Sequence, residues 1–249
     1  MSTPVYVLPD SHENNKYRLA DKVAALVHKW EQAKKDGTEA LVEGRVFGYT
    51  VHINGGWDRY PVILRELSNE FGVKSYNIKA EVIKASEPEV LFLEEYSKYR
   101  PLFRLLPRLD TDIIESLTGE TDPLREFSSH RPIYDVCKEA GIGIIPIDDK
   151  DLMDEYTQVS YLIDSIIKHG GEKRKKDIPA LKKKADRITL RRSKKMLELI
   201  WEELGADPGR TFVAMVGTMH YENFKKIESG VTICHINERL GYVGSNLRI

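Results

Sequence analysis

The chain has 249 residues, of which 41% are hydrophobic and 31% are charged, and a formal net charge of -1. This length suits one large α/β domain whose core needs no cross-links. The near-zero net charge provides no overall field that would attract nucleic acid or acidic lipid. The two cysteines, Cys137 and Cys234, form no C-x-x-C pair, so there is no zinc-ribbon or thioredoxin motif and a reducing compartment is favoured.

The first residues contain neither a basic n-region nor an apolar h-region, and we therefore expect no signal peptide. No run approaches the roughly 18 apolar residues that cross a bilayer. We expect a cytoplasmic protein with a single α/β domain over residues 1–249 and without a membrane span.

The amino-terminal half begins with an apolar run at 5–8, which predicts a buried strand. Residues 17–35 have apolar positions at three- and four-residue spacing, typical of a helix that Asn14 or Asn15 would cap. Residues 39–57 look extended and predict either a strand or a hairpin. A helix is expected over 58–71 and ended by Gly72, while 73–85 is ambiguous.

The carboxyl-terminal half alternates short apolar runs with helical patterns. We expect strands at 90–93, 142–147, 212–216 and 231–236. We expect helices at 110–117, 130–140, 153–168 and 187–204. The basic stretch over 170–186 is expected to be a mobile, solvated connector. The alternation predicts an α/β fold, in which a mostly parallel sheet is flanked by helices, and the last strand is a candidate edge for oligomer formation.

Ionisable residues follow four of the predicted strands at their carboxyl ends, the edge where open α/β sheets bind ligands. These residues are Asp10 and His12, Glu94, Asp148 and Asp149, and His220 and Glu222. His12 and His220 each lie three residues after the residue that breaks a strand. If the first strand and the 212–216 strand are neighbours, the two histidines face each other across this edge.

Such a cluster has two chemical uses. His12, Glu94 and His220 would hold a divalent ion (Mn, Zn or Fe) that lowers the pKa of a bound water. Alternatively, one histidine acts as a general base that a carboxylate orients, without a metal. A structural role also stays open for each position, because polar residues at strand ends cap helices and close turns.

Two histidine segments carry a resemblance to a known superfamily. Gly217-Thr218-Met219-His220 is a G-x-x-H motif, and Pro9-Asp10-Ser11-His12-Glu13-Asn14 looks like a G-E-x-H-x-N motif with proline and aspartate at its first two positions. The segment 88–94 resembles a P-D-v-v-l-v-E strand, and 144–151 is similar to a strand that ends in D-R-D. Together these motifs resemble the superfamily of TraB and Tiki proteins, haem-binding ChaN proteins and erythromycin esterases.

The resemblance implies a pseudo-symmetric fold like that of the erythromycin esterases and ChaN proteins, with a polar site of His12, Glu94, Arg192 and His220. It implies a hydrolase, either metal-dependent and peptidase-like or esterase-like, that acts on a small molecule or a peptide. Asp10 would orient His12, and Asp148 and Glu222 would complete the ligand-binding edge. Arg192 would stabilise an anionic transition state.

Two other functions remain as alternatives. The first is a haem- or small-ligand-binding protein of the ChaN type, in which Tyr6, Tyr17 or Tyr221 would ligate iron. The second is an interaction module that uses the basic residues 173–195. That stretch contains almost no aromatic residue for base stacking, so the sequence does not favour nucleic acid as a partner.

Overall fold

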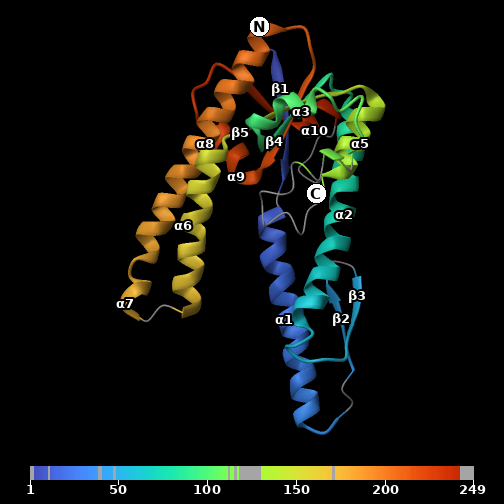
Figure 1. Ribbon diagram of the computed structural model, residues 1–249, viewed down its shortest axis with the longest axis vertical. Coiled ribbons are helices and arrows are strands. Elements are labelled where there is room, and N and C mark those ends of the chain that lie inside the picture. The colour runs from blue at the N-terminus through green and yellow to red at the C-terminus, as the bar shows by residue number, and fades with distance from the viewer. Residues whose placement is uncertain are drawn as a thin grey trace.

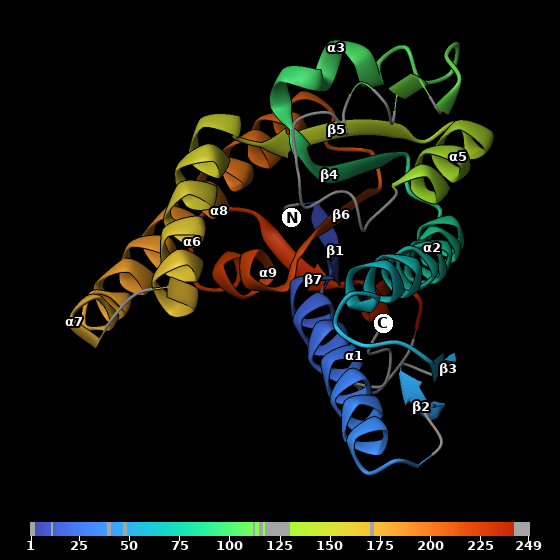
Figure 2. The ribbon, with the colours of Figure 1, turned by 60° about the horizontal axis from the view of Figure 1, so that its bottom comes forward.

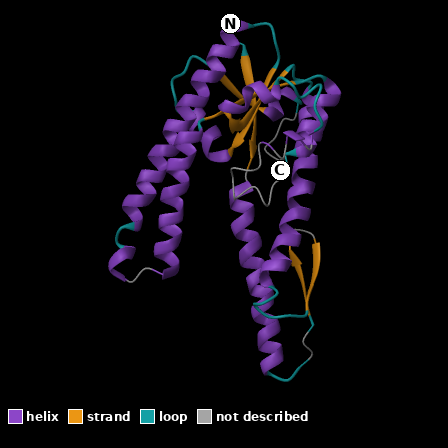
Figure 3. Ribbon diagram, viewed as in Figure 1, coloured by secondary structure: helices purple, strands orange, loops and turns teal. Residues whose placement is uncertain are grey.

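The computed structural model describes residues 3–241 apart from 11, 39–40, 47–48, 112, 115–116, 118–129 and 170–171, and it leaves the side chains of 12–18, 68–69, 71–73, 168–169 and 172–173 undescribed. Its centre is a five-stranded parallel sheet in the order β5-β4-β6-β1-β7 (Figure 3). The strands are β1 (Pro4–Asp10), β4 (Val90–Tyr96), β5 (Gly143–Asp148), β6 (Phe212–Gly217) and β7 (Thr232–His235). The predicted α/β class is confirmed.

The first strand and the strand before the second histidine are neighbours, as the sequence suggested. β1 lies between β6 and β7, and its last residue, Asp10, is in register with Gly217 at the end of β6. Because all five strands run parallel, their polar carboxyl ends meet at one edge of the sheet. β7 is an edge strand, as expected, and β5 forms the opposite edge.

Two long helical arms extend from the sheet (Figures 1 and 2). One contains α1 (His12–Lys35) and α2 (Tyr60–Ser86), with the antiparallel hairpin of β2 (Val42–Val46) and β3 (Tyr49–Ile53) beside them. The other contains α6 (Lys150–His169) and α8 (Ile178–Ala206), joined near the short helix α7 (Glu172–Lys175). For residues 39–57 the sequence left a single strand and a hairpin as alternatives, and the structure contains the hairpin.

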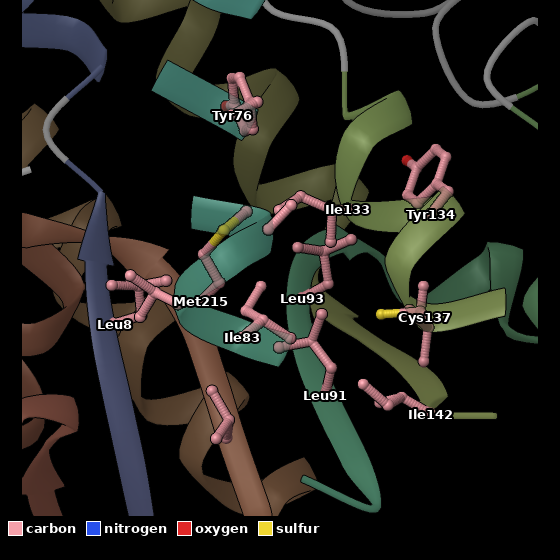
Figure 4. Packing of buried hydrophobic residues seen from close by; sticks show 14 of the residues in the cluster. Leu8, Tyr76, Ile83, Leu91, Leu93, Ile133, Tyr134, Cys137, Ile142 and Met215 are labelled. Atoms are coloured by element: carbon pink, nitrogen blue, oxygen red, sulfur yellow. The ribbon is translucent and has the colours of Figure 1, made fainter. Parts of the chain in front are cut away.

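Each face of the sheet has its own apolar core. Leu8, Leu91, Leu93 and Met215 point toward α2 and α5 (Arg131–Ala140), where Ile83 and Ile133 meet them (Figure 4). The alternate strand residues, among them Phe92 and Phe212, pack on α8 and on α9 (Thr218–Phe224). This alternation decides which helix each polar residue at the strand ends will meet.

Short elements complete the described chain. They are η1 (Ser97–Tyr99), α3 (Arg100–Phe103) and α10 (Ile236–Arg239). Among the described residues, no helix combines the length and the apolar composition needed to span a membrane. The helix predicted over 110–117 and the loop after it lie largely outside the described residues.

Several predicted boundaries are wrong. α1 begins at His12, so Asn14 and Asn15 lie inside the helix and not before its first turn. α2 continues through Gly72 because Tyr76, Ala80 and Ile83 bury a continuous face, which outweighs a cost of about 1 kcal/mol for a helical glycine. α8 begins at Ile178 instead of near Arg187, with a proline in its first turn.

Candidate functional site at the carboxyl edge of the sheet

The predicted polar residues lie at one edge of the sheet but on its two opposite faces. The sequence predicted that the strand would end at Leu93, before Glu94. In the structure β4 continues to Tyr96, so Glu94 and Glu95 lie inside it. They are consecutive, so one side chain points toward α8 and α9 and the other toward α2 and α5. The pairing of β4 with β5 shifts register between Leu93 and Tyr96, as in a β-bulge at this point.

On the α8 face, Arg192 joins two carboxylates. Its Nη2 donates to Glu94 Oε1 over 3.0 Å and to Asp148 Oδ2 over 2.6 Å, and its Nε donates to Asp148 Oδ1 over 3.1 Å. The guanidinium is only 5% exposed, whereas the Glu94 side chain is 21% exposed. Glu94 is therefore the acidic residue of this cluster that solvent or a ligand reaches most easily.

His220 lies in the first turns of α9 and is held at both ring nitrogens. Nδ1 is 2.8 Å from Ser193 Oγ, and Nε2 is 3.3 Å from Glu94 Oε1. The Ser193 hydroxyl donates its one proton to the Thr189 carbonyl and accepts a bond from Asn223. Because Ser193 has already donated its proton to Thr189, its oxygen can only accept a hydrogen bond from His220. This assigns a proton to His220 Nδ1, and Nε2 then faces the Glu94 carboxylate.

Gly217, the glycine of the G-x-x-H motif, has a positional role. Its backbone N–H donates to Glu94 Oε2 over 2.6 Å. A Cβ at this position would lie 3.3 Å from that same oxygen and 3.7 Å from His220 Cδ2. The backbone is in an ordinary conformation with φ of -54°, so the glycine is explained by the close approach of these two side chains.

The two carboxylates differ in their electrostatics. Burial raises the pKa of Glu94, but the charges of His220 and Arg192 and the hydrogen bonds it accepts outweigh burial, and its pKa falls well below the ordinary 4.5. Burial raises the pKa of Asp148 above 3.8; Arg192 opposes this and the nearby Glu94 charge adds to it.

The other predicted residues of this face have different positions. Asp149 accepts the Leu152 N–H in the first turn of α6 and pairs with Lys195, so it caps a helix. Glu222 pairs with Lys225 and is about half exposed, away from the Arg192 cluster. His12 begins α1, next to the paired Asp10 and Gly217, but its side chain lies outside the described residues.

A second buried network occupies the α2 face. Asp10 accepts from Lys79 Nζ over 2.6 Å and from the Tyr76 hydroxyl over 3.2 Å. His130 Nε2 is 3.0 Å from that hydroxyl, and His130 Nδ1 is 2.7 Å from Glu95 Oε1. Because Tyr76 donates its one proton to Asp10, its oxygen is the acceptor in the contact with His130 Nε2. Tyr134 also donates to Glu95 over 2.9 Å.

Several members of these networks were not predicted from the sequence. His130 stands at the start of the helix expected over 130–140; it precedes α5, makes no capping bond and contacts Glu95. Tyr76 and Lys79 lie in the stretch that was ambiguous, and their three-residue spacing on one helical face was the available signal. Ser193, next to Arg192, carried no signal of its own. The two networks touch where Thr218 Oγ1 donates to the Asp10 carbonyl over 3.0 Å.

Two of the three predicted metal ligands, Glu94 and His220, lie together on the α8 face, whereas the side chain of the third, His12, lies outside the described residues. Among the described residues, no group of three His, Cys, Asp or Glu side chains is arranged to hold one. Glu94 Oε1 and His220 Nε2 converge, but the Arg192 guanidinium contacts the same carboxylate oxygen over 3.0 Å. A dication bound there would lie against a fixed positive charge.

Comparison of the chain with family models, curated proteins and solved structures finds no match.

Proposed function

We propose that the protein is a hydrolase in which His220 and Glu94 activate a water molecule, as in a metal-free member of the TraB, Tiki, ChaN and erythromycin esterase superfamily. One observation carries the proposal: His220 is fixed at Nδ1 by Ser193, so its Nε2 is directed at the partly exposed Glu94 carboxylate. A histidine held by one nitrogen and paired with a carboxylate at the other is a general base with a stabilised protonated form.

The chemistry follows from the proton positions. A water that contacts Nε2 and Glu94 Oε1 would give its proton to Nε2 as it attacks an ester or amide carbonyl. The imidazolium that forms would face the Glu94 carboxylate, whose lowered pKa keeps it ionised. His220 would then return the proton to the leaving group.

Arg192 has a different role here from the one that the superfamily resemblance implies. It is buried and donates three bonds to Glu94 and Asp148. We assign it as a positioning residue that holds the Glu94 carboxylate against His220, with Asp148 as the second anchor. It does not need to contact the substrate, which would be a small molecule or a peptide.

The alternative is binding of haem or another small ligand without catalysis. Of the candidate iron ligands, Tyr6 packs under Arg239 and Tyr221 packs against His235 and Lys225, whereas the Tyr17 side chain lies outside the described residues. No contact among these described residues favours iron, so we rank this function second. A Soret band on titration with haemin would favour it.

The test compares His220→Gln, Glu94→Gln and the control His52→Gln, whose side chain is exposed on β3. A panel of chromogenic esters and peptides is assayed with and without a metal chelator. We expect both site variants to lose about 100-fold or more in kcat/KM, with unchanged circular dichroism, and the control and the chelator to have no effect. Full activity in His220→Gln would refute the proposal, and loss of activity with the chelator would restore the metal hypothesis.

A further inference from the structure

The α6–α8 arm carries a charge that the whole-chain total conceals. Residues 150–195 contain 14 Lys and Arg against 7 Asp and Glu, a net charge of +7 in a chain of net charge -1, which leaves -8 for the other residues. The arm extends away from the sheet, and α7 lies at its far end (Figures 1 and 2). Such segregation of charge gives the arm a local field that attracts polyanions.

Part of this charge is already used inside the protein. Arg192 belongs to the buried cluster, Arg191 and Lys184 pair with Glu155, and Lys195 pairs with Asp149. The other exposed cations of the outer arm include Arg174, Lys176, Lys182, Lys183, Arg187 and Lys194.

Three of these cations share one line along α8. Lys183, Arg187 and Lys194 are four and seven residues apart in turn, spacings that keep side chains on the same side of a helix. Leu190 lies on this line between Arg187 and Lys194 and is 39% exposed. The exposed side of α8 is thus a basic line interrupted by a leucine.

The outer part of α6 adds exposed apolar side chains. Tyr161, Leu162 and Ile167 are 53%, 47% and 55% exposed. Ile167 lies two residues from the end of α6, beside the segment that leads to α7. Large side chains of this kind next to cations are typical of surfaces that contact a lipid interface.

We propose that the outer part of the α6–α8 arm is a peripheral contact surface for an anionic lipid membrane. The cations contact the headgroups, and Leu162, Ile167 and Leu190 enter the interface. Nucleic acid fits less well, because the large exposed apolar side chains described within residues 150–195 are mostly aliphatic and Tyr161 is the aromatic one among them. This surface lies outside the proposed catalytic cluster and its function does not depend on it.

The test uses the full chain and vesicles of phosphatidylcholine alone or mixed with phosphatidylserine. The charge-reversed variant Lys176→Glu, Lys183→Glu, Arg187→Glu is compared with Lys29→Glu, Lys34→Glu, Lys35→Glu, which makes the same charge change on exposed positions of α1. Wild type and the α1 control are expected to sediment with the anionic vesicles only. The arm variant should bind at least about 100-fold more weakly, since each of the three lost cations contributes roughly a fivefold gain in binding to an anionic surface.

A second variant, Leu162→Ser with Ile167→Ser, separates insertion from simple charge attraction. It should weaken vesicle binding several-fold and leave the salt dependence of binding unchanged. Equal binding to both vesicle types, equal loss in the α1 control, or binding of a single-stranded oligonucleotide without vesicle binding would each overturn the proposal. Circular dichroism of each variant confirms that the fold is retained.

Discussion

Replacing Arg192 by methionine tests the electrostatics of the α8 face directly. The substitution keeps an unbranched apolar stem in the helix but removes the cation that Glu94 and Asp148 share. Both carboxylates then lie beside each other without the guanidinium that joined them, and the His220 ring lies next to Glu94. Removing one partner from a buried ion pair costs about 3 to 5 kcal/mol, and we expect a loss of unfolding free energy in that range near neutral pH.

The loss should depend on pH in a defined direction. Arg192 helps to lower the pKa of Glu94, and it opposes the effect of burial on Asp148. The stability that a lowered carboxyl pKa contributes is present above the unfolded-state value of 4.5 and declines as the pH falls below it. In the variant, the pKa values of both carboxyls rise, so the folded protein takes up protons at higher pH than the wild type. The difference in unfolding free energy between the wild type and the Arg192→Met variant is therefore largest near neutral pH. It becomes smaller as the pH falls toward about 4.

Urea unfolding at several pH values between these limits measures the effect. Arg192→Lys is the matched control, because it keeps the charge and loses the two-pronged contact with Asp148, and it should cost less than the methionine variant. Combining Arg192→Met with Asp148→Asn should recover part of the stability by removing one uncompensated charge. A loss below about 1 kcal/mol, or one that does not change with pH, would refute the account of this cluster.

Two further substitutions and one labelling experiment test the same edge of the sheet and the core. Gly217→Ala should cost about 1 to 3 kcal/mol in urea unfolding, because its Cβ would lie 3.3 Å from Glu94 Oε2; an unchanged midpoint would contradict this contact. Tyr76→Phe removes the hydroxyl that donates to Asp10 and should cost about 1 to 3 kcal/mol, whereas a neutral result would show that the network adds no stability. Burial raises the pKa of the Cys137 thiol to about 12, so this thiol should react with a disulfide reagent only after unfolding, and rapid labelling of the native protein at this position would refute its burial.

The strands were the most predictable part of the fold. The central strands contain short runs, 90–93 in β4 and 212–216 in β6, that are buried on both faces, which makes them apolar throughout and visible in the sequence. Helix boundaries were less predictable because tertiary packing sets them. Gly72 is a local stop signal, but the apolar face after it packs on the sheet and carries α2 fourteen residues further, to Ser86.

The α8 face of the site was also visible in the sequence, since Glu94, Asp148 and His220 are polar residues placed directly after or at the ends of apolar strands. The α2 face was not. Tyr76, Lys79 and His130 come from helix α2 and the start of α5, and their meeting depends on how those helices dock on the sheet. Such contacts arise from tertiary geometry, which no spacing along the chain encodes. The superfamily resemblance and the hydrolase activity stay predictions.

Side-chain alternation along β4 lets one strand serve both networks, and the pairing with β5 shifts register at the same point. Between Leu93 and Tyr96, β4 advances three residues while β5 advances two, from Pro146 to Asp148. The extra residue falls at Glu94 and Glu95, where a bulge re-aims side chains and raises the local twist. Glu94 thereby meets Arg192 and His220, while Glu95 meets His130 and Tyr134. The two networks on opposite faces of the sheet are therefore anchored to the same two consecutive residues of β4.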